Sequence, residues 1–118
     1  MARAEIRYLQ IPTDDVAASA RFYERALGWM IRTRSDGSTA FDDTTAEVSG
    51  EWVLDRQAAG DTGVLVHVRV DDVEASLGRI TEAGGEIVVP RTRQGEGIAY
   101  ATFRDPAGNV LGVFQEIG

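Results

Sequence analysis

Residues 13–29 read TDDVAASARFYERALGW, and residues 70–86 read VDDVEASLGRITEAGGE. Each stretch contains Asp-Asp-Val, in which an Asp can accept a hydrogen bond from a free backbone N–H at the start of a helix. Apolar or small residues then recur at i, i+4, i+7 and i+11, which is the spacing of one helical face. Glycine follows in both stretches and is typical of a helix end. The sequence therefore predicts two similar helices, with the aspartates as caps and not as catalytic carboxylates.

The two helices belong to a longer internal repeat. Asp15 and Asp72 are 57 residues apart (72 − 15 = 57), and the same offset pairs Ser19 with Ser76. Alternating or apolar runs flank both helices and predict strands. These runs are residues 5–12, 29–34, 38–43 and 46–54 in the first half, and 64–70, 86–90, 97–104 and 110–117 in the second. The prediction is an α+β fold made of two tandem βαβββ modules (1–54 and 64–118), joined by a linker (55–63) into one domain with a curled mixed sheet around a cleft.

Composition narrows the class of protein. The chain has 118 residues, no cysteine and a formal net charge of −7. A surface this acidic repels phosphate backbones, so we expect no nucleic-acid partner. No window approaches the roughly 20 apolar residues of a membrane-spanning helix, and the N-terminus lacks the apolar core of a signal peptide. We therefore expect a cytoplasmic protein with no membrane partner.

Residues 11–29 (IPTDDVAASARFYERALGW), 68–90 (VRVDDVEASLGRITEAGGEIVVP) and 103–113 (FRDPAGNVLGV) resemble the vicinal oxygen chelate superfamily. This superfamily includes glyoxalases, bleomycin-resistance proteins and extradiol dioxygenases. The resemblance implies two βαβββ modules whose strands form a cleft, often completed across a homodimer. It leaves the chemistry open, because members isomerise, cleave rings, epimerise or only sequester a drug.

Metal-dependent members take four ligands, His or Gln and Glu, from the first and last strands of each module. By resemblance, these positions fall on Tyr8, Gly50, Leu65 and Gly112. A glycine or leucine side chain offers no donor to a divalent cation. A shift of one residue around Gly50 would place Glu51 in the cleft, but one carboxylate would not rebuild the set. We therefore expect no metal and no cofactor.

Strand alternation predicts what lines the cleft instead. The expected ligand-binding residues are Tyr8, Gln10, Trp52, His67, Phe114 and Glu116. His67, the only histidine, is the one candidate for a catalytic acid or base, although a structural histidine is the alternative. Trp52 and Phe114 fit core filling as well as a ligand wall, and Glu116 fits a surface ion pair with Arg69. Residues 91–97 predict a solvated hairpin loop, with a lid over the cleft as the alternative.

The function predicted from these observations is binding of a small, largely apolar organic molecule by a metal-free, glyoxalase/bleomycin-resistance-like homodimer. One alternative is a metal-free lyase or isomerase that uses His67 as acid or base. Another is a metal-dependent lyase or dioxygenase of the same superfamily. The sequence leaves open the identity of the ligand, catalysis itself and the mode of dimer pairing.

Overall fold

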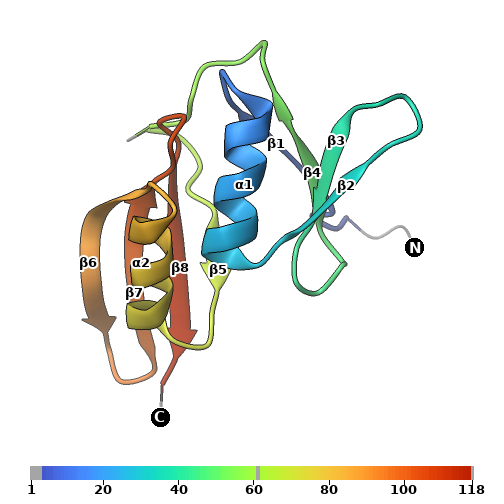
Figure 1. The fold of residues 1–118 in the computed structure, drawn as a ribbon. Helices are drawn as coiled ribbons and strands as arrows, with labels where there is room; N and C mark the ends of the chain where they lie inside the picture. The colour runs from blue at the N-terminus through green and yellow to red at the C-terminus, as the bar shows by residue number, and fades with distance from the viewer. Residues whose placement is uncertain (1–3, 61, 118) are drawn as a thin grey trace.

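The computed structural model describes residues 4–60 and 62–117, so Asp61 of the expected linker lies outside the described residues. Its elements follow the predicted repeat (Figure 1). The first module contains β1 (Tyr8–Pro12), α1 (Val16–Leu27), β2 (Met30–Thr33), β3 (Thr39–Asp42) and β4 (Ser49–Val53). The second contains β5 (His67–Arg69), α2 (Val73–Glu82), β6 (Glu86–Gln94), β7 (Ile98–Arg104) and β8 (Val110–Glu116). The α+β class and the two βαβββ modules are confirmed.

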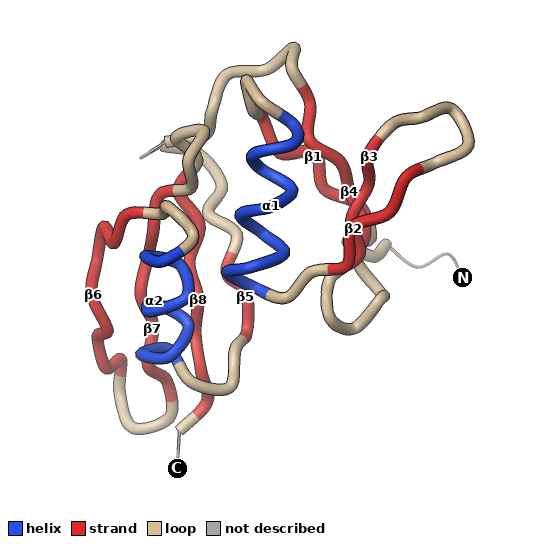
Figure 2. The backbone as a smooth tube through the Cα atoms, in the orientation of Figure 1, coloured by secondary structure: helices blue, strands red, loops and turns tan. Residues whose placement is uncertain are grey.

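Each module forms its own four-stranded mixed sheet. The strand order is β1-β4-β3-β2 in the first sheet and β5-β8-β7-β6 in the second. In each sheet the first strand pairs parallel with the last, and the other pairs are antiparallel. Residues 54–60 and 62–66, between β4 and β5, form loops that lead from one sheet toward the other (Figure 2). Among the described residues, no strand of one sheet pairs with a strand of the other.

The helix caps match the sequence prediction. The Asp15 carboxylate accepts a hydrogen bond from the Ala18 N–H at 3.0 Å, and Asp72 accepts one from the Ala75 N–H at 3.2 Å. After α1, Gly28 adopts a left-handed conformation with φ of 72°, which a side chain would disfavour. The two Asp-Asp-Val motifs therefore start helices, as the spacing predicted.

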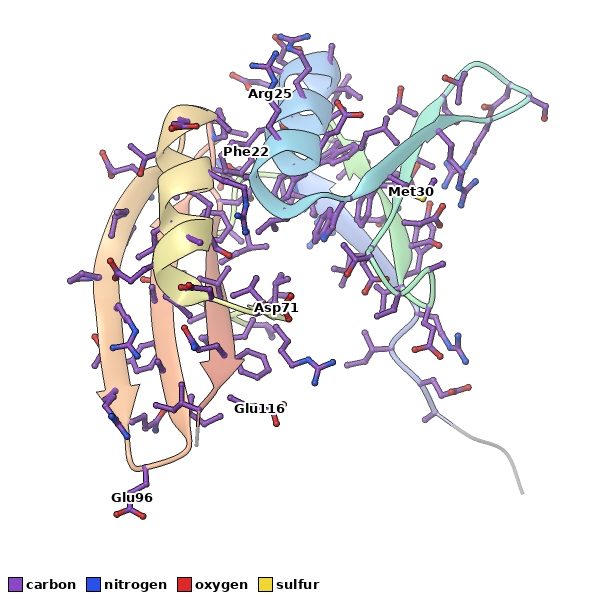
Figure 3. The ribbon with its side chains drawn as sticks, turned by 60° about the horizontal axis from the view of Figure 1, so that its bottom comes forward. Phe22, Arg25, Met30, Asp71, Glu96 and Glu116 are labelled. Carbon is purple, nitrogen blue, oxygen red and sulfur yellow. The ribbon has the colours of Figure 1, made fainter. Side chains whose placement is uncertain are left out.

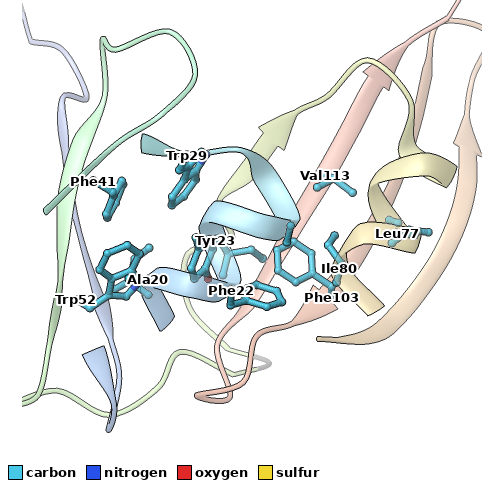
Figure 4. Packing of buried hydrophobic residues seen from close by; sticks show 14 of the residues in the cluster. Ala20, Phe22, Tyr23, Trp29, Phe41, Trp52, Leu77, Ile80, Phe103 and Val113 are labelled. Carbon is cyan, nitrogen blue, oxygen red and sulfur yellow. The ribbon is translucent and has the colours of Figure 1, made fainter. Parts of the chain in front are cut away.

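One core joins the two modules, and α1 lies at its centre (Figure 4). Tyr23 packs toward the first sheet, with its ring centroid 5.8 Å from that of Trp52. The neighbouring Phe22 packs toward the second sheet, 6.0 Å from Phe103. Because adjacent residues on a helix point in different directions, α1 contributes apolar surface to both modules. Burial of these aromatic side chains gives the core much of its stability.

A network of buried hydrogen bonds also connects the modules. Asp105 and Asn109 lie in the turn between β7 and β8, and the Tyr23 hydroxyl donates to Asp105 Oδ2 at 2.7 Å. Asn109 Nδ2 donates to the Pro12 carbonyl at 2.7 Å, and its Oδ1 accepts from the Ala59 N–H at 2.9 Å. The sequence DPAGN was predicted only as a turn. In the structure it also joins α1, β1 and the linker.

Candidate functional site

Each sheet has one face on the helices and one open face, and the register of β1 against β4 sets which side chains share a face. Gln10 pairs with Glu51, and Leu9 pairs with Gly50. Since side chains alternate along a strand, Glu51 lies on the open face with Gln10, and Gly50 faces the helices with Leu9. The expected register around Gly50 is therefore wrong by one residue, and Glu51 occupies the position assigned to Gly50.

The correction also moves Trp52 to the helix side. Trp52 is only 4% exposed, and its ring packs 4.9 Å from that of Phe41. Gly50 has no room for a side chain, because a Cβ atom there would lie 2.4 Å from Phe41 Cζ. The aromatic core of the first module thus requires glycine at 50 and uses Trp52 as filler. Trp52 is not on the open face where we expected it.

The open face of the first sheet carries a polar cluster of Tyr8, Gln10, Arg34 and Glu51. Gln10 Nε2 donates to Glu51 Oε2 at 2.9 Å, and Arg34 Nη1 donates to Glu51 Oε1 at 3.2 Å. Arg34 Nη2 donates to the Tyr8 hydroxyl. The hydrogen bond from Gln10, followed by that from Arg34, holds the pKa of Glu51 below its ordinary value. Glu51 is therefore an ionised carboxylate with both oxygens already engaged.

The open face of the second sheet is aromatic, and we call His67, Tyr100 and Phe114 the aromatic platform. Tyr100 pairs with Phe114 across β7 and β8, so their side chains share a face. The rings of His67 and Tyr100 meet edge to face with centroids 6.5 Å apart. Gly112 lies under His67, since a Cβ atom at 112 would be 2.2 Å from His67 Nδ1. The missing side chain at 112 is what lets the imidazole lie close to β8.

Two expected roles remain to be placed: acid or base chemistry at His67 and ligand binding by Glu116. His67 is exposed, and among the described residues nothing hydrogen-bonds to its ring, so its role as acid or base stays a prediction. Glu116 accepts a hydrogen bond from Arg69 at 3.3 Å, and both side chains are more than half exposed. This contact fits the surface ion pair that the sequence offered as an alternative. A ligand contact by Glu116 likewise stays a prediction.

Arg34 and Tyr100 were not among the site residues predicted from the sequence. Alternation along residues 97–104 would have placed Tyr100 beside Phe114, because Thr102 and Gly112 fall on the same face. Arg34 carried no such signal. It follows β2 in a turn, and it reaches the site only because the turn returns the chain toward β4.

The two open faces are turned away from each other within one chain. Figure 4 shows α1 between the first sheet, marked by Trp52 and Phe41, and the second sheet, marked by Phe103 and Val113. Figure 3 shows the sheets splaying apart from α1, with Met30 on one and Glu116 on the other. A single chain therefore presents the polar cluster and the aromatic platform on different sides of the molecule.

Between the splayed sheets lies an apolar notch of about 720 Å³. Its walls combine helix-facing side chains of both sheets, the segment that leads into β5, His67 and Arg69 of β5 itself, and several polar loop residues. They include Leu9, Leu27, Trp29, Phe41, Val48, Val64, Leu65, Val66, Val68 and Val70. Val64 is 87% exposed, and β1 and β5 each have one edge without a paired strand among the described residues. The notch and the edges are surfaces that monomeric proteins usually cover.

The family model of the Glyoxalase/Bleomycin resistance protein/Dioxygenase superfamily matches residues 5–113 of the chain. The chain belongs to this superfamily. Among solved structures, a glyoxalase/bleomycin resistance protein/dioxygenase family enzyme from Burkholderia phytofirmans PsJN superposes with a TM-score of 0.80 at 18% identity, covering 97% of this chain and all of that one. TnmS3, an antibiotic binding protein from Streptomyces sp. CB03234, superposes with a TM-score of 0.75 at 24% identity, over 99% of both chains.

The anthracycline biosynthesis protein DnrV of Streptomyces peucetius is 29% identical over 92% of this chain. The chain spans about half the length of DnrV, 46% of it. In the part of the chain that the structure describes, no helix is long and apolar enough to cross a membrane.

The residues of this member do not fit the metal that the superfamily implies. With the corrected register, the four positions hold Tyr8, Glu51, Leu65 and Gly112. Leu65 and Gly112 have no donor atom, and Glu51 already binds the cation of Arg34. Within residues 4–60 and 62–117, no three His, Asp or Glu side chains group closely enough to hold a metal ion. We derive no chemistry through a metal at this site.

Proposed function

We propose that the chain binds a small, planar, largely apolar organic molecule without a metal. The molecule lies between the aromatic platform of one copy and the polar cluster of a second copy. The observation that carries the proposal is the aromatic platform itself: His67, Tyr100 and Phe114 share an open sheet face where relatives would need metal donors. Partly exposed aromatic rings bind flat apolar molecules by stacking and by excluding water.

Two of the compared proteins support this class of ligand. TnmS3 is described as an antibiotic binding protein, and DnrV takes part in anthracycline biosynthesis. Both matches cover most of this chain. A hydrophobic, ring-containing molecule is therefore the first ligand to test. The acidic charge of the chain, −7, also favours a cationic or neutral ligand over a strongly anionic one.

The outward direction of the two open faces supports a homodimer. A second copy that covers the apolar notch and lies along the free edges of β1 and β5 would bring its aromatic platform opposite the polar cluster of the first. Covering exposed apolar side chains such as Ile6, Val64 and Leu65 stabilises association by roughly 25 cal/mol per Å² of apolar area. Two equivalent clefts result from a two-fold axis.

Calorimetric titration with an anthracycline tests the proposal, at low and at high salt to remove non-specific attraction by the acidic surface. We expect saturable binding that survives salt, and Phe114→Ala should weaken it about tenfold or more because a stacking surface is lost. Ile87→Ala is the matched control: Ile87 pairs with Phe103, so it lies on the helix-facing side of the same sheet. Equal affinity of wild type and Phe114→Ala would contradict the proposed site.

A further inference from the structure

The Arg34 side chain begins in a well-bonded turn between β2 and β3. The Arg34 N–H donates to the Ser38 carbonyl at 2.8 Å, and the Arg34 carbonyl accepts from the Gly37 N–H at 2.9 Å. Ala40 on β3 pairs with Glu51, so it lies on the same open face, and it is fully buried there. A side chain this small leaves room for Arg34 to cross β3 and reach β4.

The guanidinium of Arg34 is held by a closed triangle of hydrogen bonds. Arg34 Nη1 donates to Glu51 Oε1 at 3.2 Å, and Arg34 Nη2 donates to the Tyr8 hydroxyl. The Tyr8 hydroxyl donates in turn to the Glu51 carboxylate, which also accepts from Gln10. The N–H groups of a guanidinium all lie in its plane, so these contacts hold the orientation of that plane.

The faces of this guanidinium remain available to a ligand. Its hydrogen bonds use its edge, and the Arg34 side chain is still 28% exposed. Because an arginine can stack on an aromatic ring and keep its in-plane hydrogen bonds, a ring can lie on the exposed face without breaking the triangle. Arg32, the other arginine of this open face, is bonded to Asp42 across β2 and β3, farther from β1.

We propose that the exposed face of Arg34 stacks on an electron-rich aromatic ring of the ligand, which is held between Arg34 of one copy and the aromatic platform of a second copy. The inference rests on the proposed function and adds to it the class of ligand. A cation is attracted to the negative face of an electron-rich ring and repelled by an electron-poor ring of the same shape. Arg34 contacts the ligand, and Tyr8 and Glu51 are positioning residues.

The selection for an electron-rich ring comes from Arg34 and not from the platform. Tyr100 and Phe114 have rings with negative faces, so by themselves they favour an electron-poor ring stacked on them. Arg34 reverses this preference on the opposite side of the ligand. A free arginine would lose side-chain freedom when it stacks, whereas Arg34 is already ordered by its turn and its hydrogen bonds.

Naphthalene and octafluoronaphthalene test the inference, because they share a shape and have opposite charge distributions on their faces. Displacement of a bound anthracycline, followed by its fluorescence, gives the Kd of each probe. Arg34→Met keeps the length of the side chain and removes the charge. We expect it to shift the ratio of the two Kd values toward octafluoronaphthalene by about fivefold or more. Because the ratio is compared between wild type and variant, the different hydrophobicity of the probes cancels.

Two further variants separate stacking from other electrostatic effects. Loss of Arg34 alone leaves Glu51 without its cation, and this negative charge would itself favour the fluorinated ring. The double variant Arg34→Met with Glu51→Gln removes both charges and should show the same shift. Arg32→Met is the matched control, because Arg32 pairs with Asp42 at 2.8 Å and should leave the ratio unchanged. Thermal midpoints of all variants check that the fold is intact.

The outcomes are distinct. An unchanged ratio in Arg34→Met, with both probes weakened by Phe114→Ala, overturns the inference and leaves the proposed function standing. A shift in Arg34→Met that is absent from the double variant assigns the effect to Glu51 and also overturns the inference. If the anthracycline binds and neither probe displaces it, the stacking site assigned to Arg34 is wrong. If the anthracycline does not bind to the folded protein, the proposed function fails and the inference fails with it.

Discussion

Gly50 sets the side of the first sheet on which every residue of β4 lies. A Cβ atom at 50 would lie 2.3 Å from the Leu9 carbonyl oxygen and 2.4 Å from Phe41 Cζ. Neither group can move easily, because one is backbone and the other is a fully buried ring. The absence of a side chain at 50 therefore allows the aromatic core to close and leaves Glu51 on the open face.

Gly50→Ala should consequently lower the free energy of unfolding by about 1–3 kcal/mol, as overpacking does in other cores. Urea denaturation monitored by circular dichroism measures the change. Gly97→Ala is the control, since nothing lies within 4 Å of a Cβ atom at 97. A stability of Gly50→Ala equal to that of Gly97→Ala would show that the register described for β4 is incorrect.

The sequence did not predict which face of the sheet each side chain of β4 occupies. In residues 46–54, apolar side chains occur in both alternation phases, with Val48 and Trp52 in one and Val53 in the other. The turn before β4 also contributes to the register: in it Asp43 Oδ1 accepts hydrogen bonds from Thr45, and Ala46 has a positive φ of 62°. A conformation of this kind leaves little trace in the sequence, so Glu51 and Trp52 were exchanged in the prediction.

At the scale of elements, the helices were more predictable than the strands. A cap, an apolar stripe and a terminal glycine are all local, and both helices begin after the predicted aspartates. The strands depend on partners. β5 has three residues where the apolar run 64–70 predicted seven, and β6 extends to Gln94, through most of the segment 91–97 that was predicted as a loop.

The turn between β7 and β8 acts as an element that holds the modules together through Tyr23. Burial, and then the negative charge of Asp105 beside it, raises the pKa of Tyr23 well above its ordinary value. Below the pKa of an unfolded tyrosine, about 10, both states keep the proton and the hydrogen bond stabilises the fold. Above it the unfolded chain loses the proton first, so this stabilisation falls as the pH rises.

Tyr23→Phe should therefore destabilise the protein by about 1–2 kcal/mol near neutral pH, the cost of a lost buried hydrogen bond. The difference between wild type and Tyr23→Phe should shrink as the pH rises above about 10. Urea denaturation of both proteins across this range measures it. A difference that stays constant with pH would mean that Tyr23 keeps no raised pKa in the fold.

At the scale of the whole molecule, the chain is broad and flat, with extents of 46 × 42 × 25 Å. The helices occupy the space between the sheets, so the faces that could hold a ligand point outward and the apolar notch stays open. The repeat of 57 residues predicted two equivalent modules but gave no information about their relative orientation. That orientation depends on long-range contacts such as the pair of Phe22 and Phe103.

The central claim is that each cleft combines the first sheet of one copy with the second sheet of another. Co-expression of a Tyr8→Ala chain and a Phe114→Ala chain, each with a different affinity tag, gives a heterodimer that can be purified and titrated with an anthracycline. In this heterodimer one cleft carries neither substitution and the other carries both. We therefore predict wild-type affinity at about half of the wild-type number of sites. If each cleft belonged to a single chain, both clefts would carry one substitution, and the complete absence of wild-type sites would contradict the claim.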